Sequence, residues 1–198
     1  MRLLPVVITT VGLAAAAAPA MAADLTVSVE IPRLNTASYH RPYVAVWIER
    51  PDQTAVRTLA VWYQQTRNSE GDGKDWLKDL RTWWRKGGRA MALPADGVSG
   101  ATRAPGRQTI AVPGARLRNL QPGQYNIVVE AARELGGREV VRVPFRWGAA
   151  NAGAGTGSTE LGAVRVAVSP WALYGGKGPR LCRAWATPAE AAYLRHVP

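Results

Sequence analysis

One short segment carries residue types and spacing that could support chemistry. Residues 96–102 read Asp-Gly-Val-Ser-Gly-Ala-Thr. The two glycines keep the backbone flexible and let the active site of another protein close over the segment. Ala101 adds no bulk beside Thr102, so the Thr102 hydroxyl is a candidate acceptor for a phosphoester. The alternative is an ordinary hairpin loop whose turn begins at Asp96.

The charge distribution favours an anionic ligand near this segment. The 198 residues carry a formal charge of +11, which favours phosphates, nucleic acid or a lipid surface as partners. Residues 81–118 hold eight basic residues and one acid, Asp96. The basic residues are Arg81, Arg85, Lys86, Arg89, Arg103, Arg107, Arg116 and Arg118. We therefore expect a positive field around Thr102 that attracts and holds phosphate groups.

The segment resembles the acceptor motif of proteins that receive covalent FMN. In that motif an Asp lies three residues before a Ser or Thr, and Gly-Ala-Thr follows. The matching residues are Asp96, Ser99, Gly100, Ala101 and Thr102. The resemblance implies that these residues form a cofactor-binding segment with FMN joined to Thr102 through its phosphate. It also implies a partner, an extracytoplasmic flavin transferase that uses FAD as donor.

The N-terminal residues have the form of a secretory signal peptide. Residues 1–22 combine Arg2 with an apolar run and end in Ala-Met-Ala, so we expect cleavage before Ala23. An uncleaved membrane anchor is the alternative, and Pro19 and the small-residue site disfavour it. The mature chain has no second long apolar run, so we expect no membrane span. Export to the periplasm also argues against nucleic acid as the partner.

Other kinds of site have little support. One cysteine, Cys182, and two histidines exclude a disulfide framework, a zinc ribbon and a histidine-rich metal cage. Ser99 has no evident His and Asp partners for a hydrolase triad, and His40 is expected to be structural. No Gly-rich loop follows a strand and opens a helix, so a Rossmann or P-loop nucleotide site is unsupported.

Short alternating runs predict a mainly β fold. Seven runs have strand character and are separated by Gly and Pro turns. They are residues 25–31, 43–49, 59–63, 125–131, 139–145 and 161–168, with a shorter run at 109–112. Gly136-Gly137 indicates a hairpin. We expect an antiparallel β-sandwich, immunoglobulin-like in architecture, over residues 23–170.

One segment interrupts the strand pattern with helical spacing. Residues 75–86 are expected to form a short amphipathic helix, capped by Asp75 and ended by Gly87-Gly88. We expect its tryptophans to pack on the sandwich, with stacking on a flavin ring as the alternative. These tryptophans are Trp76, Trp83 and Trp84.

Three other segments are expected to be irregular. Residues 94–107 are rich in Gly and Pro and should form the exposed loop that carries Thr102. Residues 148–158 (GAANAGAGTGS) are of low complexity, so we expect a flexible linker before the last strand. Residues 171–198 are expected to be a loosely ordered tail.

Six stretches between residue 24 and about 168 resemble a bacterial family of predicted periplasmic proteins, domain-of-unknown-function family 2271. These stretches are residues 25–35, 39–52, 59–63, 76–86, 96–103 and 128–139. Members of that family often accompany the flavin transferase and membrane proteins with PepSY-type domains. The resemblance therefore implies extracytoplasmic electron transfer, with a PepSY-type membrane protein as electron donor.

Two functions of different classes stay open at this point. The first is a periplasmic redox protein that carries FMN on Thr102 and acts as an electron carrier rather than as a free-standing enzyme. The alternative is a non-enzymatic, basic β-sandwich that binds an anionic ligand or partner in the cell envelope without flavin. An enzyme with a site not evident in the sequence is a third, weaker hypothesis.

Overall fold

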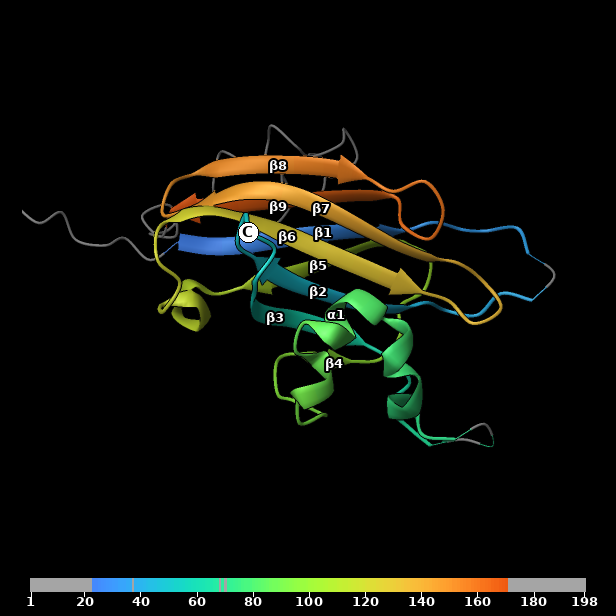
Figure 1. The fold of residues 1–198 in the computed structure, drawn as a ribbon. Helices are drawn as coiled ribbons and strands as arrows, with labels where there is room; N and C mark the ends of the chain where they lie inside the picture. Colours follow the sequence, from blue (N-terminus) through green and yellow to red (C-terminus); the bar gives the residue numbers. More distant parts are fainter. Residues whose placement is uncertain (1–22, 37, 68, 70, 171–198) are drawn as a thin grey trace, which may run out of the picture.

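The computed structural model describes residues 23–170 except residues 37, 68 and 70. These residues form two β-sheets that pack face to face (Figure 1), which confirms the predicted mainly β sandwich. The predicted signal peptide (1–22) and C-terminal tail (171–198) lie outside the described residues.

The two sheets contain four and five strands. The first has the order β5 (Gly106–Val112), β1 (Ala23–Ile31), β9 (Ala163–Pro170), β8 (Asn151–Thr156). The second has the order β4 (Ser99–Gly100), β3 (Ala55–Trp62), β2 (Tyr43–Glu49), β6 (Gly123–Ala132), β7 (Arg138–Trp147). All seven predicted runs correspond to strands, most with shifted or extended ends. Neighbours pair antiparallel, except that β4, which the sequence did not predict, pairs parallel with β3.

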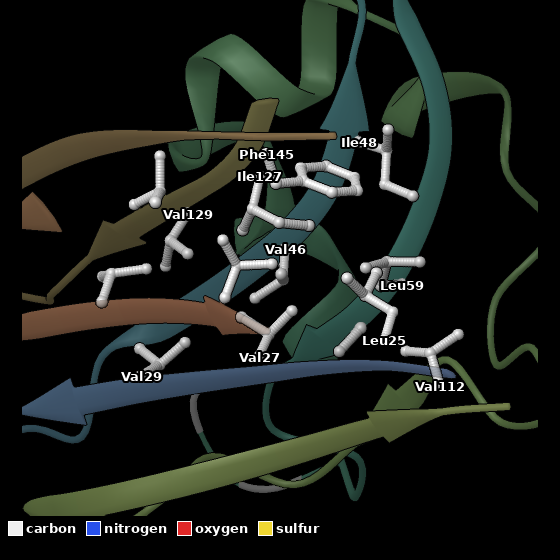
Figure 2. Packing of buried hydrophobic residues seen from close by; sticks show 14 of the residues in the cluster. Leu25, Val27, Val29, Val46, Ile48, Leu59, Val112, Ile127, Val129 and Phe145 are labelled. Atoms are coloured by element: carbon white, nitrogen blue, oxygen red, sulfur yellow. The ribbon is translucent and has the colours of Figure 1, made fainter. Parts of the chain in front are cut away.

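Alternating side chains from both sheets fill the space between them. In β1, Leu25, Val27 and Val29 are fully buried, whereas the residues between them are partly exposed. Figure 2 shows these side chains facing Val46 of β2 and Ile127 of β6. Burial of one such side chain contributes about 1.5–3 kcal/mol, so the period-two pattern in the sequence is what holds the sheets together.

A helical layer covers the outer face of the second sheet (Figure 1). It consists of the 3-10 segment η1 (Gly73–Asp79), the helix α1 (Arg81–Arg85) and the 3-10 turn η2 (Gly88–Ala90). Leu77, Leu80 and Trp83 pack against Ala45 and Trp47 of β2. For this reason β2 is buried on both faces, which explains its continuous apolar sequence.

The predicted single helix over residues 75–86 is corrected to two pieces. The chain leaves helical geometry at Leu80, which has φ −75° and ψ 66°. The N-terminal cap is Asp72 rather than Asp75, because the Asp72 carboxylate accepts the backbone N–H of Lys74 at 3.0 Å. Gly87, with φ 136°, ends the layer's α-helix as predicted, since few other residues adopt that backbone conformation.

The prediction of a flexible linker over residues 148–158 is wrong, because β8 lies within it and pairs along its length with β9. A Cβ on Gly153 would clash with the carbonyl oxygen of Pro144 in β7, and one on Gly155 would lie 3.1 Å from Val143. Small residues at every second position therefore allow β7 and β8 to approach closely. The glycines here serve packing rather than flexibility.

Candidate functional site

The predicted acceptor segment passes from one sheet to the other. A turn at residues 95–98 leads into β4 on the edge of the second sheet, and residues 101–105 then cross to the start of β5 in the first sheet. Thr102 lies in this crossing segment, outside any strand, and is partly exposed. The expected irregular loop is thus present, with the short strand β4 inside it.

Backbone hydrogen bonds hold the first half of the segment on β3. The N–H of Val61 donates to the carbonyl of Val98 at 2.8 Å, and the N–H of Tyr63 donates to that of Gly100 at 2.9 Å. The Ser99 hydroxyl accepts the N–H of Ala95 at 2.9 Å and closes the turn. Ser99 therefore has a structural partner of its own, and the register of β4 determines where the crossing begins.

The two glycines of the segment are needed for different physical reasons. Gly97 has φ 66°, a left-handed conformation that the turn requires. A Cβ on Gly100 would lie 3.1 Å from the Trp62 ring and 3.5 Å from Nη2 of Arg103. The absence of a side chain at Gly100 thus leaves room for the Arg103 guanidinium, which lies over the Trp62 ring at 5.3 Å from its centroid. The sequence did not suggest this pairing, because Trp62 lies in β3 and Arg103 lies much later in the chain, in the crossing segment.

Thr102 and Arg103 are both available for further contacts. Within residues 23–170, apart from the three omitted positions, the Thr102 hydroxyl has no hydrogen-bond partner, and Arg103 has no carboxylate within 4 Å. Ala101 is exposed beside Thr102, and Asp96 is exposed on the turn. A hydroxyl and an unneutralised guanidinium therefore lie on adjacent residues, a combination suited to a phosphate ester.

The structure gives the basic residues of this stretch different neighbours. Lys86 forms a 2.8 Å ion pair with Glu49, which is fully buried at the opposite end of β2 from Tyr43. Arg116 lies against Gly97, where a Cβ would be 3.5 Å from its guanidinium carbon. Of the eight predicted basic residues, Arg103 is the one that adjoins Thr102 directly in the chain.

Several loops gather at the end of the sandwich that holds Thr102. Strand pairing places Gly106 beside Ile31 and Tyr43 beside Ala132, so the crossing segment lies with the β1–β2 loop and the β6–β7 turn (Figure 1). Two large hydrophobic side chains are exposed among the described residues, Trp76 at 48% and Leu135 at 83%. Leu135 lies in the β6–β7 turn, and Trp76 lies in η1, beside the end of β3.

His40 joins two of these loops. Its Nε2 lies 3.0 Å from the Ser38 hydroxyl, and its Nδ1 lies 3.4 Å from the Glu134 carboxylate of the β6–β7 turn. Neighbouring Tyr39 has a buried hydroxyl without a hydrogen-bond partner in the described part of the chain, and burial raises its pKa. Ser38 and Glu134 are on the surface, so this contact connects loops, in agreement with the structural role expected for His40.

Metal and membrane features are limited in the described part of the chain. Its residues include no group of three or more His, Cys, Asp or Glu side chains placed to hold a metal ion. None of its helices is long and apolar enough to cross a bilayer.

Comparison with known proteins identifies the family. No curated protein and no solved structure matches this chain. The sequence model of DUF2271, described as a predicted periplasmic protein, matches residues 24–163 and so covers β1 to the start of β9, including Thr102. The chain belongs to the DUF2271 family of predicted periplasmic proteins.

Proposed function

We propose that this protein carries FMN on Thr102 through a phosphoester and acts in extracytoplasmic electron transfer with a membrane partner of the PepSY type. The observation that carries the proposal is the position of the Thr102 hydroxyl. It lies in a partly exposed crossing segment, without a hydrogen-bond partner among the described residues, at the end of a complete acceptor motif. A hydroxyl so placed is accessible to the active site of a second protein.

The attachment step balances with FAD as donor. The Thr102 oxygen attacks the FMN-side phosphorus of the FAD pyrophosphate, and the bond from that phosphorus to the bridging oxygen breaks. AMP leaves, and the hydroxyl proton passes to a base of the transferase. The product is a phosphodiester with one negative charge on the residue that precedes Arg103.

The residues around Thr102 fit this product. Ala101 and Arg103 are exposed, so neither buries the hydroxyl. Arg103 can donate charge-assisted hydrogen bonds to the phosphodiester. Because its side chain is already stacked on Trp62, it loses less conformational entropy when it binds the phosphate. When bound, FMN supplies the redox chemistry, and the chain supplies attachment, position and electrostatic environment.

The proposed role requires export. Cleavage before Ala23 would leave the described strand β1 (Ala23–Ile31) intact. Ala23 pairs with Pro170 of β9, and the mature N-terminus would thus be part of the first sheet.

A binding module without flavin is the second candidate. The unneutralised guanidinium of Arg103 favours it, because such a group also recognises an anionic partner in the envelope without any covalent step. This function requires neither the Thr102 hydroxyl nor FAD.

Intact mass distinguishes the two candidates. The full-length precursor is co-expressed with an extracytoplasmic flavin transferase, and the exported protein is weighed. We expect a gain of one FMN less one water and yellow fluorescence that survives denaturation. Thr102→Ala should abolish both, and Thr102→Ser should retain part. Thr109→Ala, an exposed threonine in β5, is the matched control and should be labelled like the wild type. An unlabelled wild type would leave the binding module as the function.

A further inference from the structure

Trp76 is the one exposed tryptophan among the described residues, with 48% of its surface accessible. It lies in η1, between the buried Gly73 and Leu77. Lys78 places its ammonium 5.4 Å from the centre of the Trp76 ring. Among the described residues, Leu135, at 83%, is the other exposed large hydrophobic side chain.

The other two tryptophans of this layer have structural roles. Trp83 is 2% exposed and donates its indole N–H to the Thr58 hydroxyl at 3.0 Å. Trp84 is partly buried against the same cluster and contacts the Trp83 ring at a centroid distance of 6.3 Å. The expectation that all three tryptophans pack on the sandwich therefore fails for Trp76.

Trp76 and Thr102 both lie near the end of β3. The carbonyl of Gly100 accepts the N–H of Tyr63. Thr102 follows Gly100 by two residues, so the Cα atoms of Gly100 and Thr102 are at most about 7 Å apart. Gly73 packs directly on the backbone of Gln64, and Trp76 follows it by three residues, or about 6 Å along a 3-10 helix. Tyr63 and Gln64 are the two residues that follow β3, so Trp76 and Thr102 each lie a few residues from a contact with this short segment.

We propose that Trp76 is the surface on which the isoalloxazine ring of FMN attached to Thr102 stacks. This inference rests on the proposed function and adds where the ring lies. The ring is planar, aromatic and partly apolar, so an exposed indole face is a complementary surface for it. The phosphate would remain near Arg103 while the flexible ribityl chain spans the distance to η1.

Lys78 adds a second interaction at the same place. Its ammonium lies over one face of the Trp76 ring, 5.4 Å from the ring centre, so the flavin stacks on the opposite face, with the Lys78 charge across the indole. A positive charge in this position favours added electron density on the flavin, which makes the stacked ring easier to reduce than one in water.

The test compares flavin fluorescence in full-length chains that carry FMN. Wild type, Trp76→Ala, Trp76→Phe and Leu135→Ala are labelled with the transferase, and intact mass establishes their FMN content. Emission per bound FMN is then measured before and after unfolding, because an indole stacked on isoalloxazine quenches its emission. Leu135→Ala is the control, since it removes the other exposed large hydrophobic side chain of the described residues, at the same end of the sandwich. Circular dichroism verifies that each variant is folded.

We expect the wild type and Leu135→Ala to be quenched when folded and to brighten on unfolding. In Trp76→Ala the ratio of stacked to free ring should fall about two- to tenfold, the change expected for loss of one aromatic contact. Trp76→Phe should retain part of the quenching. Fully labelled Trp76→Ala that is quenched like the wild type would overturn this inference alone. A wild type without FMN would overturn the proposed function and this inference with it.

Discussion

Basic side chains have different neighbours beneath the helical layer and in the crossing segment at residues 101–105. Beneath the helical layer, Lys86 after α1 and two arginines of β7 meet fully buried carboxylates of β2 and β6: Glu49 binds Lys86 at 2.8 Å and Arg142 at 3.3 Å, and Glu130 binds Arg138 at 2.7 Å. In the crossing segment Arg103 lies on an aromatic ring and has no carboxylate within 4 Å among the described residues.

The difference shows that the neighbours of a basic residue in the fold, rather than in the sequence, decide whether a carboxylate neutralises its charge. Glu130 also accepts the backbone N–H groups of Thr82 and Trp83, at 3.0 and 2.7 Å, so it fixes the start of α1 on the sheet. Cations around such carboxylates are already neutralised by the fold. A guanidinium held by a ring retains its charge for a ligand.

The largest effect expected from this comparison is on Glu130. Glu130→Ala removes a fully buried acceptor of three hydrogen bonds and leaves two backbone donors and Arg138 without their partner. We expect the free energy of unfolding to fall by about 3 kcal/mol, measured by urea denaturation. A loss below about 1 kcal/mol would show that water replaces the carboxylate easily.

A smaller, pH-dependent effect is expected at Glu139. Burial acts to raise its pKa, but hydrogen bonds from the backbone of Ser158, Leu161 and Thr159 lower it to about 2. Because the folded pKa lies below the unfolded value, the stabilisation is present above about pH 4.5 and is lost as the pH falls toward 2. Glu139→Gln should therefore lower stability at pH 7 by about 2 kcal/mol and flatten the acid limb of the stability curve. An acid limb identical to the wild type would contradict this assignment.

A substitution at Gly100 tests the packing of the Arg103 guanidinium on the Trp62 ring. Gly100→Val places a branched side chain where the Trp62 ring and Arg103 lie. We expect a loss of about 1–2 kcal/mol in unfolding free energy from overpacking, together with slower FMN attachment. Ala101→Val, on the exposed neighbouring residue, is the control and should leave the unfolding free energy nearly unchanged. Equal losses for both variants would show that the packing around Gly100 has no special role.

The smallest effect on stability is expected for Arg103. Arg103→Gln removes a stack on Trp62 worth about 0.5–1 kcal/mol at an exposed site. FMN attachment, followed by mass, should slow more at low salt than at high salt, since exposed charges are screened beyond about 10 Å at 0.1 M. Arg118→Gln, an exposed arginine beyond η3 (Gly114–Leu117), is the control. A salt-independent rate in Arg103→Gln and wild type alike would exclude an electrostatic role for Arg103.

Much of the fold could be predicted from local patterns, and the errors have local causes. The period-two run at Leu25–Ile31 and the turn at Gly136-Gly137 correspond to β1 and to the β6–β7 hairpin. β8 was not predicted, because Gly and Ala also alternate in flexible linkers. Its identity depends on β9, with which it pairs, and on Pro144 of β7, against which Gly153 packs.

The candidate site also has one part that local sequence patterns predict and one part that they do not. The segment from Asp96 to Thr102 can be found in the sequence, because the motif consists of neighbouring residues. The Trp62–Arg103 stack and the exposure of Trp76 could not be predicted, since helical spacing is the same for a tryptophan that reaches the sheet and for one that does not. The break at Leu80 and the cap at Asp72 decide which face of each turn meets β2.

The sequence alone determined the alternation that builds two sheets, the export signal as an expectation, and the motif that ends at Thr102. These are local properties, since a period or a motif depends on residues close together in the chain. Only the tertiary structure decided which basic residues are neutralised by buried carboxylates and that the guanidinium of Arg103 lies on the Trp62 ring. That decision depends on strand register between distant segments, which brings Glu49 to Lys86 and Trp62 to Arg103.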